Sequence, residues 1–108
     1  MKDVEYRHSW STDKSTEEEM KEKFGELLYE VSTADAYEVA ESMLFFDGKK
    51  YYWLQANGCS CWDGYYYGWE LGKTELKKLA AARAKDEDGY RGADHTKLMG
   101  IWIKENVK

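Results

Sequence analysis

The pattern of apolar and polar residues predicts a strand and then a helix in the first third of the chain. Apolar and polar residues alternate over residues 3–10, which predicts a half-buried strand. The spacing then becomes helical, and Ser15 or Thr16 can cap a helix with Glu18 or Glu19 completing a capping box. The apolar positions of this helix are Met20, Phe24, Leu27, Leu28 and Val31. We therefore expect an amphipathic helix over roughly 16–31.

The middle of the chain has the pattern of an antiparallel sheet. Residues 42–46 and 50–56 are rich in strand formers and flank Asp47-Gly48, a typical hairpin turn. Asn57-Gly58 signals a second turn, after which a third strand begins near Cys59 and a returning strand covers 65–70. Residues 33–41 are ambiguous, because Thr33 or Asp35 could cap a short second helix.

The last third contains at least one helix. Thr74 can cap a helix over about 75–85 that carries Leu76, Leu79, Ala80 and Arg83 at helical spacing. Residues 95–106 fit a helix or a strand, and Gly100 weakens the helical interpretation. Together these elements predict one α+β domain over residues 1–108. It would have a three- to four-stranded antiparallel sheet with two or three helices packed on one face.

The composition predicts a globular protein in a reducing compartment. The chain has 108 residues, of which 43% are hydrophobic, and this suffices for one domain with its own core. No apolar run is long enough for a transmembrane helix, and the first residues lack the apolar region of a secretory signal. With only two cysteines, we expect reduced thiols and a cytoplasmic location.

The charge is unevenly distributed along the sequence. The net charge is −5. Residues 1–48 contain thirteen acids and five bases, whereas residues 49–108 contain eight acids and eleven bases. An acidic total argues against direct nucleic-acid binding, which depends on neutralising phosphates. The asymmetry fits either an acidic half that meets a basic partner or an uneven but merely solubilising surface.

A row of carboxylates is the most regular candidate site. Within the expected helix, four glutamates follow one another at four-residue spacing opposite the apolar face: Glu18, Glu22, Glu26 and Glu30. Neighbours in this row would be about 6 Å apart along the axis, a spacing similar to that of backbone phosphates. The row indicates either a negative ridge for an Arg/Lys-rich groove or an ordinary solvated face.

The aromatic residues form a second candidate surface. Eight of the seventeen lie within residues 51–69. Because successive side chains of a strand point to opposite faces, the run 65–67 must direct at least one ring outward. We expect exposed aromatics near Tyr66 and Trp69 that would join the glutamates in binding. The alternative is that these rings form the core of a small sheet.

The cysteines and histidines allow two weaker hypotheses. Cys59 and Cys61 with His8 and His95 would make a Cys2His2 zinc set, although the cysteines are closer in sequence than is usual. The same residues with Asp63 could form a thiol-dependent triad. Two small buried thiols explain the pattern equally well, so no cofactor or metal is expected.

The segment Gly58-Cys59-Ser60-Cys61-Trp62-Asp63-Gly64, followed by aromatics and a helix, resembles small uncharacterised proteins encoded by tailed phages. The resemblance implies a compact accessory viral protein acting in the cytoplasm of a bacterial host. Small acidic phage proteins of this size often inhibit host nucleases, including anti-CRISPR and anti-restriction proteins that mimic DNA.

The leading hypothesis is a non-enzymatic inhibitor that binds the basic surface of a host protein, such as a defence nuclease. The alternative is a zinc- or thiol-dependent protein centred on Cys59 and Cys61. No membrane partner is expected, and homodimer formation is left open.

Overall fold

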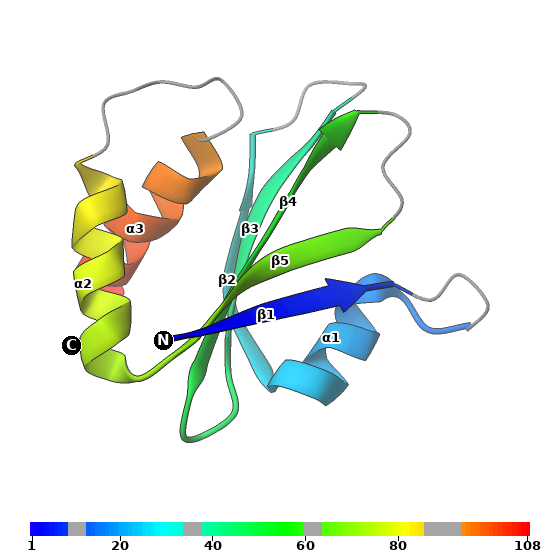
Figure 1. Ribbon diagram of the computed structural model, residues 1–108, viewed down its shortest axis with the longest axis horizontal. Coiled ribbons are helices and arrows are strands. Elements are labelled where there is room, and N and C mark those ends of the chain that lie inside the picture. The colour runs from blue at the N-terminus through cyan, green and yellow to red at the C-terminus, as the bar shows by residue number, and fades with distance from the viewer. Residues whose placement is uncertain (9–12, 34–37, 60–63, 86–93) are drawn as a thin grey trace.

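A computed structural model describes residues 1–8, 13–33, 38–59, 64–85 and 94–108. Within these ranges the chain forms a five-stranded sheet and three helices (Figure 1). In chain order the elements are β1 (Lys2–Arg7), α1 (Thr16–Phe24), β2 (Glu26–Ser32), β3 (Glu38–Phe46), β4 (Tyr51–Cys59), β5 (Tyr65–Leu71), α2 (Lys73–Ala84) and α3 (Asp94–Asn106). The predicted α+β class is therefore confirmed, with a larger sheet than the three or four strands expected.

The sheet is antiparallel throughout, in the order β1-β5-β4-β3-β2. Strands β2 to β5 follow one another as a meander, and β1 pairs with β5. The chain must consequently pass from one edge of the sheet to the other between β1 and β2. Helix α1 is part of this connection (Figure 1). The first two strands of the sequence are therefore the two edges of the sheet.

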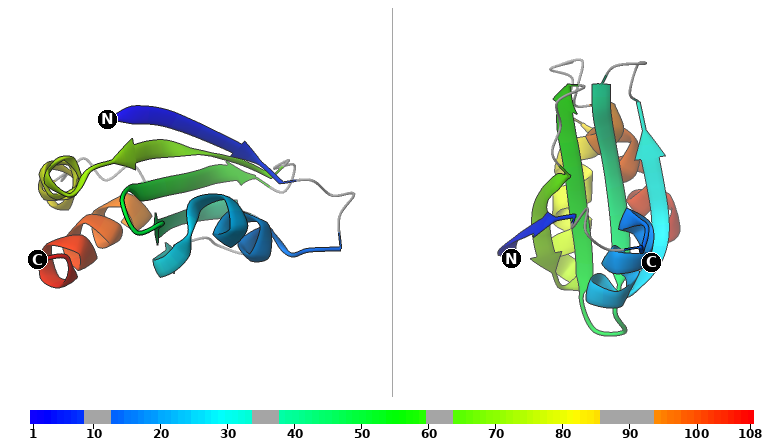
Figure 2. Two further views of the ribbon diagram at one scale, coloured as in Figure 1. Left: turned by 90° about the horizontal axis from the view of Figure 1, so that it is seen from below. Right: turned by 90° about the vertical axis from the view of Figure 1, so that its right-hand side faces the viewer.

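The helices cover both faces of the sheet, so the prediction that they pack on one face is wrong. The right-hand view of Figure 2 shows α1 in front of the sheet and α2 and α3 behind it. Side chains alternate accordingly on β3: Met43 and Phe45 pack in the core beneath α1, whereas Leu44 packs in the core beneath α2 and α3. A sheet with two apolar faces needs a cover on each, which explains the three layers.

Helix α1 begins where the sequence predicts and ends seven residues earlier. Ser15 is its N-cap, and the Ser15 hydroxyl accepts a hydrogen bond from the Glu18 N–H at 3.2 Å. Gly25 ends the helix with φ 101°, and a Cβ there would lie 2.4 Å from the carbonyl oxygen of Phe46. The backbone conformation and this close approach both require glycine, so the apolar residues after it continue in strand β2 instead of in the helix.

The predicted turns are partly confirmed. Asp47-Gly48 does connect β3 to β4, and one Asp47 carboxylate oxygen accepts the N–H groups of Lys49 and Lys50 at 2.8 Å each. The turn expected at Asn57-Gly58 does not form, because β4 continues through Cys59. The short helix considered for 33–41 is also wrong from residue 38 onward, where β3 begins.

The last two helices form an antiparallel pair on one face of the sheet. Helix α2 is capped by Gly72, whose N–H donates to the Glu75 carboxylate at 3.0 Å, and not by Thr74 as expected. Residues 95–106, which the sequence left open, are helical. The sequence left the helix uncertain because it contains Gly100. The fold requires a glycine there, since a Cβ at this position would lie 2.7 Å from the Ala80 carbonyl oxygen of α2. The glycine that weakens the isolated helix allows it to pack closely on α2.

Candidate functional site

The predicted row of four glutamates is not present, because the expected helix is divided between two elements. Glu18 and Glu22 lie on α1, whereas Glu26 and Glu30 lie on β2. Glu26 is opposite Phe46 on β3 and Glu30 is opposite Met43, with an irregularity in the pairing between them. Because Met43 faces α1 and Phe46 points to the other side, Glu26 and Glu30 lie on opposite faces of the sheet.

A different set of carboxylates gathers on the α1 face. Glu30 on β2 and Glu41 on β3 both lie there, as their register with Met43 and Ala56 requires. Partial desolvation raises the pKa of Glu30, and the negative charges of Glu17 and Glu41 raise it further. These three glutamates come from α1, β2 and β3, and only folding brings them together. We call Glu17, Glu18, Glu22, Glu30 and Glu41 the acidic face.

Lysines of the same layer neutralise this face in part. Lys14 lies 2.5 Å from a Glu22 carboxylate oxygen, and Lys21 lies 3.6 Å from that of Glu17. Both pairs are exposed, so each contributes little to stability and can exchange for another cation. Within the described part of the chain, α1 carries four glutamates against two lysines. The face is therefore acidic, although less so than an unpaired row would be.

The aromatic half of the predicted site is corrected as well. Tyr66 is only 3% exposed and belongs to the core beneath α1. Trp69 is half-buried on the opposite face, where its ring meets Trp53 edge to face and Arg83 lies over it. The outward ring that the run 65–67 requires is Tyr67, which is 38% exposed. Tyr66 and Trp69 thus cannot form one binding surface.

Buried Tyr66 nevertheless contributes to the acidic face through its hydroxyl group. The hydroxyl donates to a Glu41 carboxylate oxygen at 2.7 Å. Desolvation raises the pKa of Tyr66, and the charge of Glu41 and this hydrogen bond raise it further. The phenol therefore stays protonated at neutral pH and cannot act as a base there. Its role is to hold the Glu41 carboxylate in a fixed orientation.

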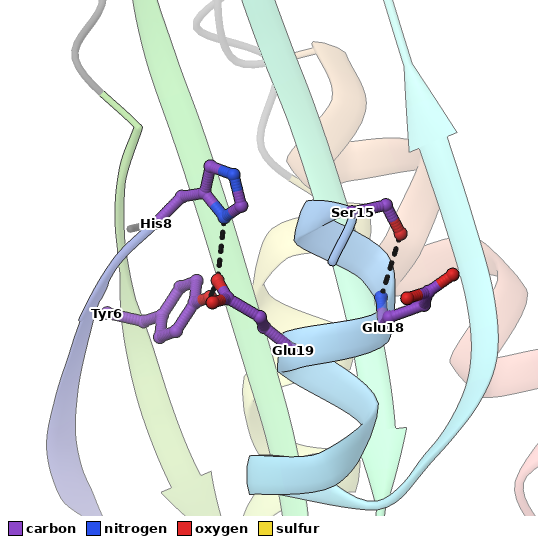
Figure 3. Close-up of polar contacts among 5 residues, drawn as sticks. All are labelled: Tyr6, His8, Ser15, Glu18 and Glu19. Carbon is purple, nitrogen blue, oxygen red and sulfur yellow. Dashed lines mark hydrogen bonds and ion pairs between the residues drawn. The ribbon is translucent and has the colours of Figure 1, made fainter. Parts of the chain in front are cut away.

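A second carboxylate is held between β1 and α1 (Figure 3). Glu19 accepts a hydrogen bond from the Tyr6 hydroxyl at 2.5 Å, and the same oxygen lies 2.7 Å from Nδ1 of His8. Tyr6 and His8 are both buried, and burial raises the pKa of Tyr6, with Glu19 adding to the effect. An open cleft of about 360 Å³ lies beside this cluster, lined by Tyr6, Arg7, Glu19, Glu22 and Lys23. The cluster attaches the edge strand to the helix.

The two histidines lie on opposite sides of the sheet. His95 lies in the first turn of α3 and is fully buried. Its Nδ1 is 2.6 Å from the Ser42 hydroxyl, and its Nε2 is 2.8 Å from the side-chain amide oxygen Oδ1 of Asn57. His8 is on the α1 face, so the two cannot bind one metal ion together. Cys61 and the side chain of Cys59 lie outside the described residues. Among the described residues, no group of three or more ligating side chains could hold a metal ion.

Sequence reasoning did not single out Glu19 and Glu41, the two carboxylates that buried tyrosines hold on the α1 face. The alternating pattern of residues 3–10 does place Tyr6 and His8 on one face, and this was the only signal pointing to the Glu19 cluster. Nothing in the sequence signals that Glu41 approaches Glu30, because the contact depends on the register between β2 and β3. The chemical result is a face of oriented carboxylates that accept hydrogen bonds and attract cations.

Helix α2, which lies on the opposite face of the sheet (Figure 2), has a basic charge balance. Helix α2 carries four basic residues against one glutamate, whereas α1 carries two lysines against four glutamates.

No described helix combines the length and the apolar character needed to cross a membrane. Comparison of the chain with protein families, with curated proteins and with solved structures finds no match.

Proposed function

We propose that the chain is a non-enzymatic binding protein whose acidic face occupies a basic, nucleic-acid-binding surface of another protein. The observation that supports it is the convergence of Glu17, Glu30 and Glu41 from three separate elements. Partial desolvation, and after it the charges of Glu17 and Glu41, raises the pKa of Glu30 there. Like charges brought together in this way cost stability, and a cationic partner would recover that cost. The resemblance of residues 58–64 to tailed-phage proteins favours a bacterial nuclease as the partner.

The site that we propose differs from the expected ridge. Glu18 and Glu22 remain in it, Glu30 and Glu41 are held at defined positions on the sheet, and Glu26 is excluded because it lies on the other face. Binding through such a face is mainly electrostatic, so it would accelerate association and weaken steeply as salt is added.

The test is affinity capture from a bacterial lysate, followed by competition with nucleic acid. We expect the captured protein to bind DNA or RNA on its own and to lose that binding when the chain is added. A variant with Glu18→Lys and Glu41→Lys should bind this protein at least about tenfold more weakly. The matched control is Asp3→Lys with Glu5→Lys, which reverses the same number of charges on the edge strand β1.

Two results would overturn the proposal. One is a complex whose affinity does not change between low and high salt. The other is equal binding by the acidic-face variant and the β1 control, because the charge on the α1 face would then have no role.

A further inference from the structure

Strand β2 is an edge strand of the described sheet. Among the described strands it pairs only with β3. The Thr33 N–H donates to the Ala40 carbonyl at 2.9 Å, so Thr33 directs its backbone groups toward β3. Because backbone groups alternate in direction along an antiparallel strand, Val31 also faces β3 whereas Glu30 directs its N–H and C=O away from it. The backbone of Glu30 can therefore pair with an added strand.

The flank of α3 beside this edge strand is apolar. Trp102 stacks on Tyr29 of β2 with ring centroids 4.6 Å apart, so this flank of the helix lies against the edge strand. Leu98 is one helical turn before Trp102 on the same side and is 43% exposed. Ile101, adjacent to Leu98 on the helix surface, is 36% exposed. An apolar surface thus continues outward from β2 over α3.

The other face of the same edge is acidic. The Glu30 side chain lies on the α1 face, as Glu41 of β3 does. Partial desolvation, and after it the charges of Glu17 and Glu41, raises the pKa of Glu30. A strand added beside β2 would direct alternate side chains to the two faces. One set would contact Leu98, Ile101 and the Tyr29–Trp102 stack, and the other set would meet the carboxylates.

We infer that the edge of β2 binds an extended segment of the basic partner by strand addition, and that this segment alternates apolar residues with Lys or Arg. The inference rests on the proposed function and specifies which part of the partner is bound. Charge complementarity favours a basic segment as the bound strand. A second copy of β2 is disfavoured, because it would place further glutamates opposite Glu30 and like charges that face each other are unfavourable. The other edge, β1, carries charges of both signs at Lys2, Asp3, Glu5 and Arg7, a pattern that discourages strand addition.

The first experiment measures backbone protection with a defined probe. The probe is a short acetylated peptide in which lysine and valine alternate, and its control is the same composition arranged as one block of each. Amide hydrogen exchange followed by NMR should show that the alternating peptide protects the Glu30 amide. The Val31 amide, already paired with β3, should change little. Equal binding of the block peptide, or binding without protection of Glu30, would overturn the inference.

The second experiment uses variants of the full chain. Glu30→Lys and Leu98→Ser, which alter the two faces of the edge separately, should each weaken binding of the alternating peptide by about tenfold. Asp3→Lys makes the same charge change on the other edge strand and should leave binding unchanged. Binding that is unaffected by both changes would contradict the inference, and circular dichroism checks that each variant is folded.

The two proposals can fail separately. If the captured partner depends on salt and on Glu18 and Glu41 but the Glu30 amide stays unprotected in its complex, the acidic face acts without strand addition and only this inference is wrong. If no basic partner is captured and the alternating peptide still protects Glu30, the proposed function is wrong instead. A dimer in light scattering whose formation protects Glu30 would identify a second copy as the occupant and overturn the inference.

Discussion

At Glu30 the folded state disfavours the charged form of the side chain. Desolvation and the charges of Glu17 and Glu41 raise its pKa, so the folded protein binds this proton more tightly than the unfolded chain does. The contribution of Glu30 to the free energy of unfolding therefore rises as the pH falls from neutral through the raised pKa. The gain is complete below the ordinary value of 4.5.

Replacing Glu30 by glutamine removes this penalty. Because Glu30 is exposed and solvent screens its charge, we expect Glu30→Gln to increase the free energy of unfolding at pH 7 by only about 0.5 kcal/mol. The substitution should have no effect once the carboxyl is protonated in both states. Urea denaturation at pH 7 and at acidic pH measures the difference. Glu26→Gln is the matched control, since it makes the same chemical change on the opposite face of the sheet. A Glu30→Gln variant less stable than the parent at pH 7 would contradict this interpretation.

Ser42 matters for a different reason, because its hydroxyl lies 2.6 Å from the buried imidazole of His95. We expect Ser42→Ala to lower the free energy of unfolding by about 1 to 3 kcal/mol, since a buried polar contact between β3 and α3 is lost. Thr74→Ala serves as the control: Thr74 is exposed and Gly72 is the cap of α2, so stability should change by less than about 0.5 kcal/mol. Chemical denaturation compares the two. A larger loss in the Thr74 variant would mean that Thr74, and not Gly72, caps the helix.

Gly100 determines how two elements pack. In an isolated helix, alanine is favoured over glycine by about 1 kcal/mol. In the protein, a Cβ at this position would lie 2.7 Å from the Ala80 carbonyl oxygen and 3.0 Å from the Ala84 nitrogen, which are backbone atoms that cannot rotate away. The steric effect should therefore exceed the gain in helix propensity.

We expect Gly100→Ala to lower the melting temperature, with a loss of about 1 to 3 kcal/mol. Lys104→Ala, on the exposed side of the same helix, should leave the melting temperature nearly unchanged. Thermal unfolding followed by circular dichroism tests both variants. Stabilisation by Gly100→Ala would show that α3 can move away from α2 at little cost.

The whole molecule has two cores that share the central strands. Adjacent residues of β3 serve different cores: Met43 packs beneath α1 and Leu44 packs beneath α2 and α3. Neither core can lose its sheet without disturbing the other, so we expect a single cooperative unfolding transition.

Met43→Ala and Leu44→Ala test this cooperativity. Each should lower the free energy of unfolding by about 2 to 5 kcal/mol. Three of the five tryptophans, Trp53, Trp69 and Trp102, belong to the core beneath α2 and α3, so their fluorescence reports on that core, whereas far-UV circular dichroism reports on the whole chain. Coincident transitions are expected even for the Met43 variant. Separate midpoints in that variant would show that the α1 layer unfolds on its own.

Local patterns of sequence determined much of the secondary structure. The alternation before residue 8, the cap at Ser15 and the Asp47-Gly48 hairpin were all predictable, because each depends on neighbouring residues alone. The end of α1 was mispredicted. The helical spacing of Leu27, Leu28 and Val31 concealed the stop at Gly25, which is enforced by the distant carbonyl of Phe46.

The candidate site was decided by tertiary structure. Glu30 was expected beside Glu26 on a helix, and it lies instead beside Glu41 on a sheet because strand register, not sequence spacing, sets which side chains meet. Likewise, the sequence identified apolar positions on most elements, but only the fold decided that α1 covers one face of the sheet and that α2 and α3 cover the other (Figure 2). Sequence determined where charge and apolar surface occur along the chain. The fold determined which of them lie together, because those contacts join residues that are distant in sequence.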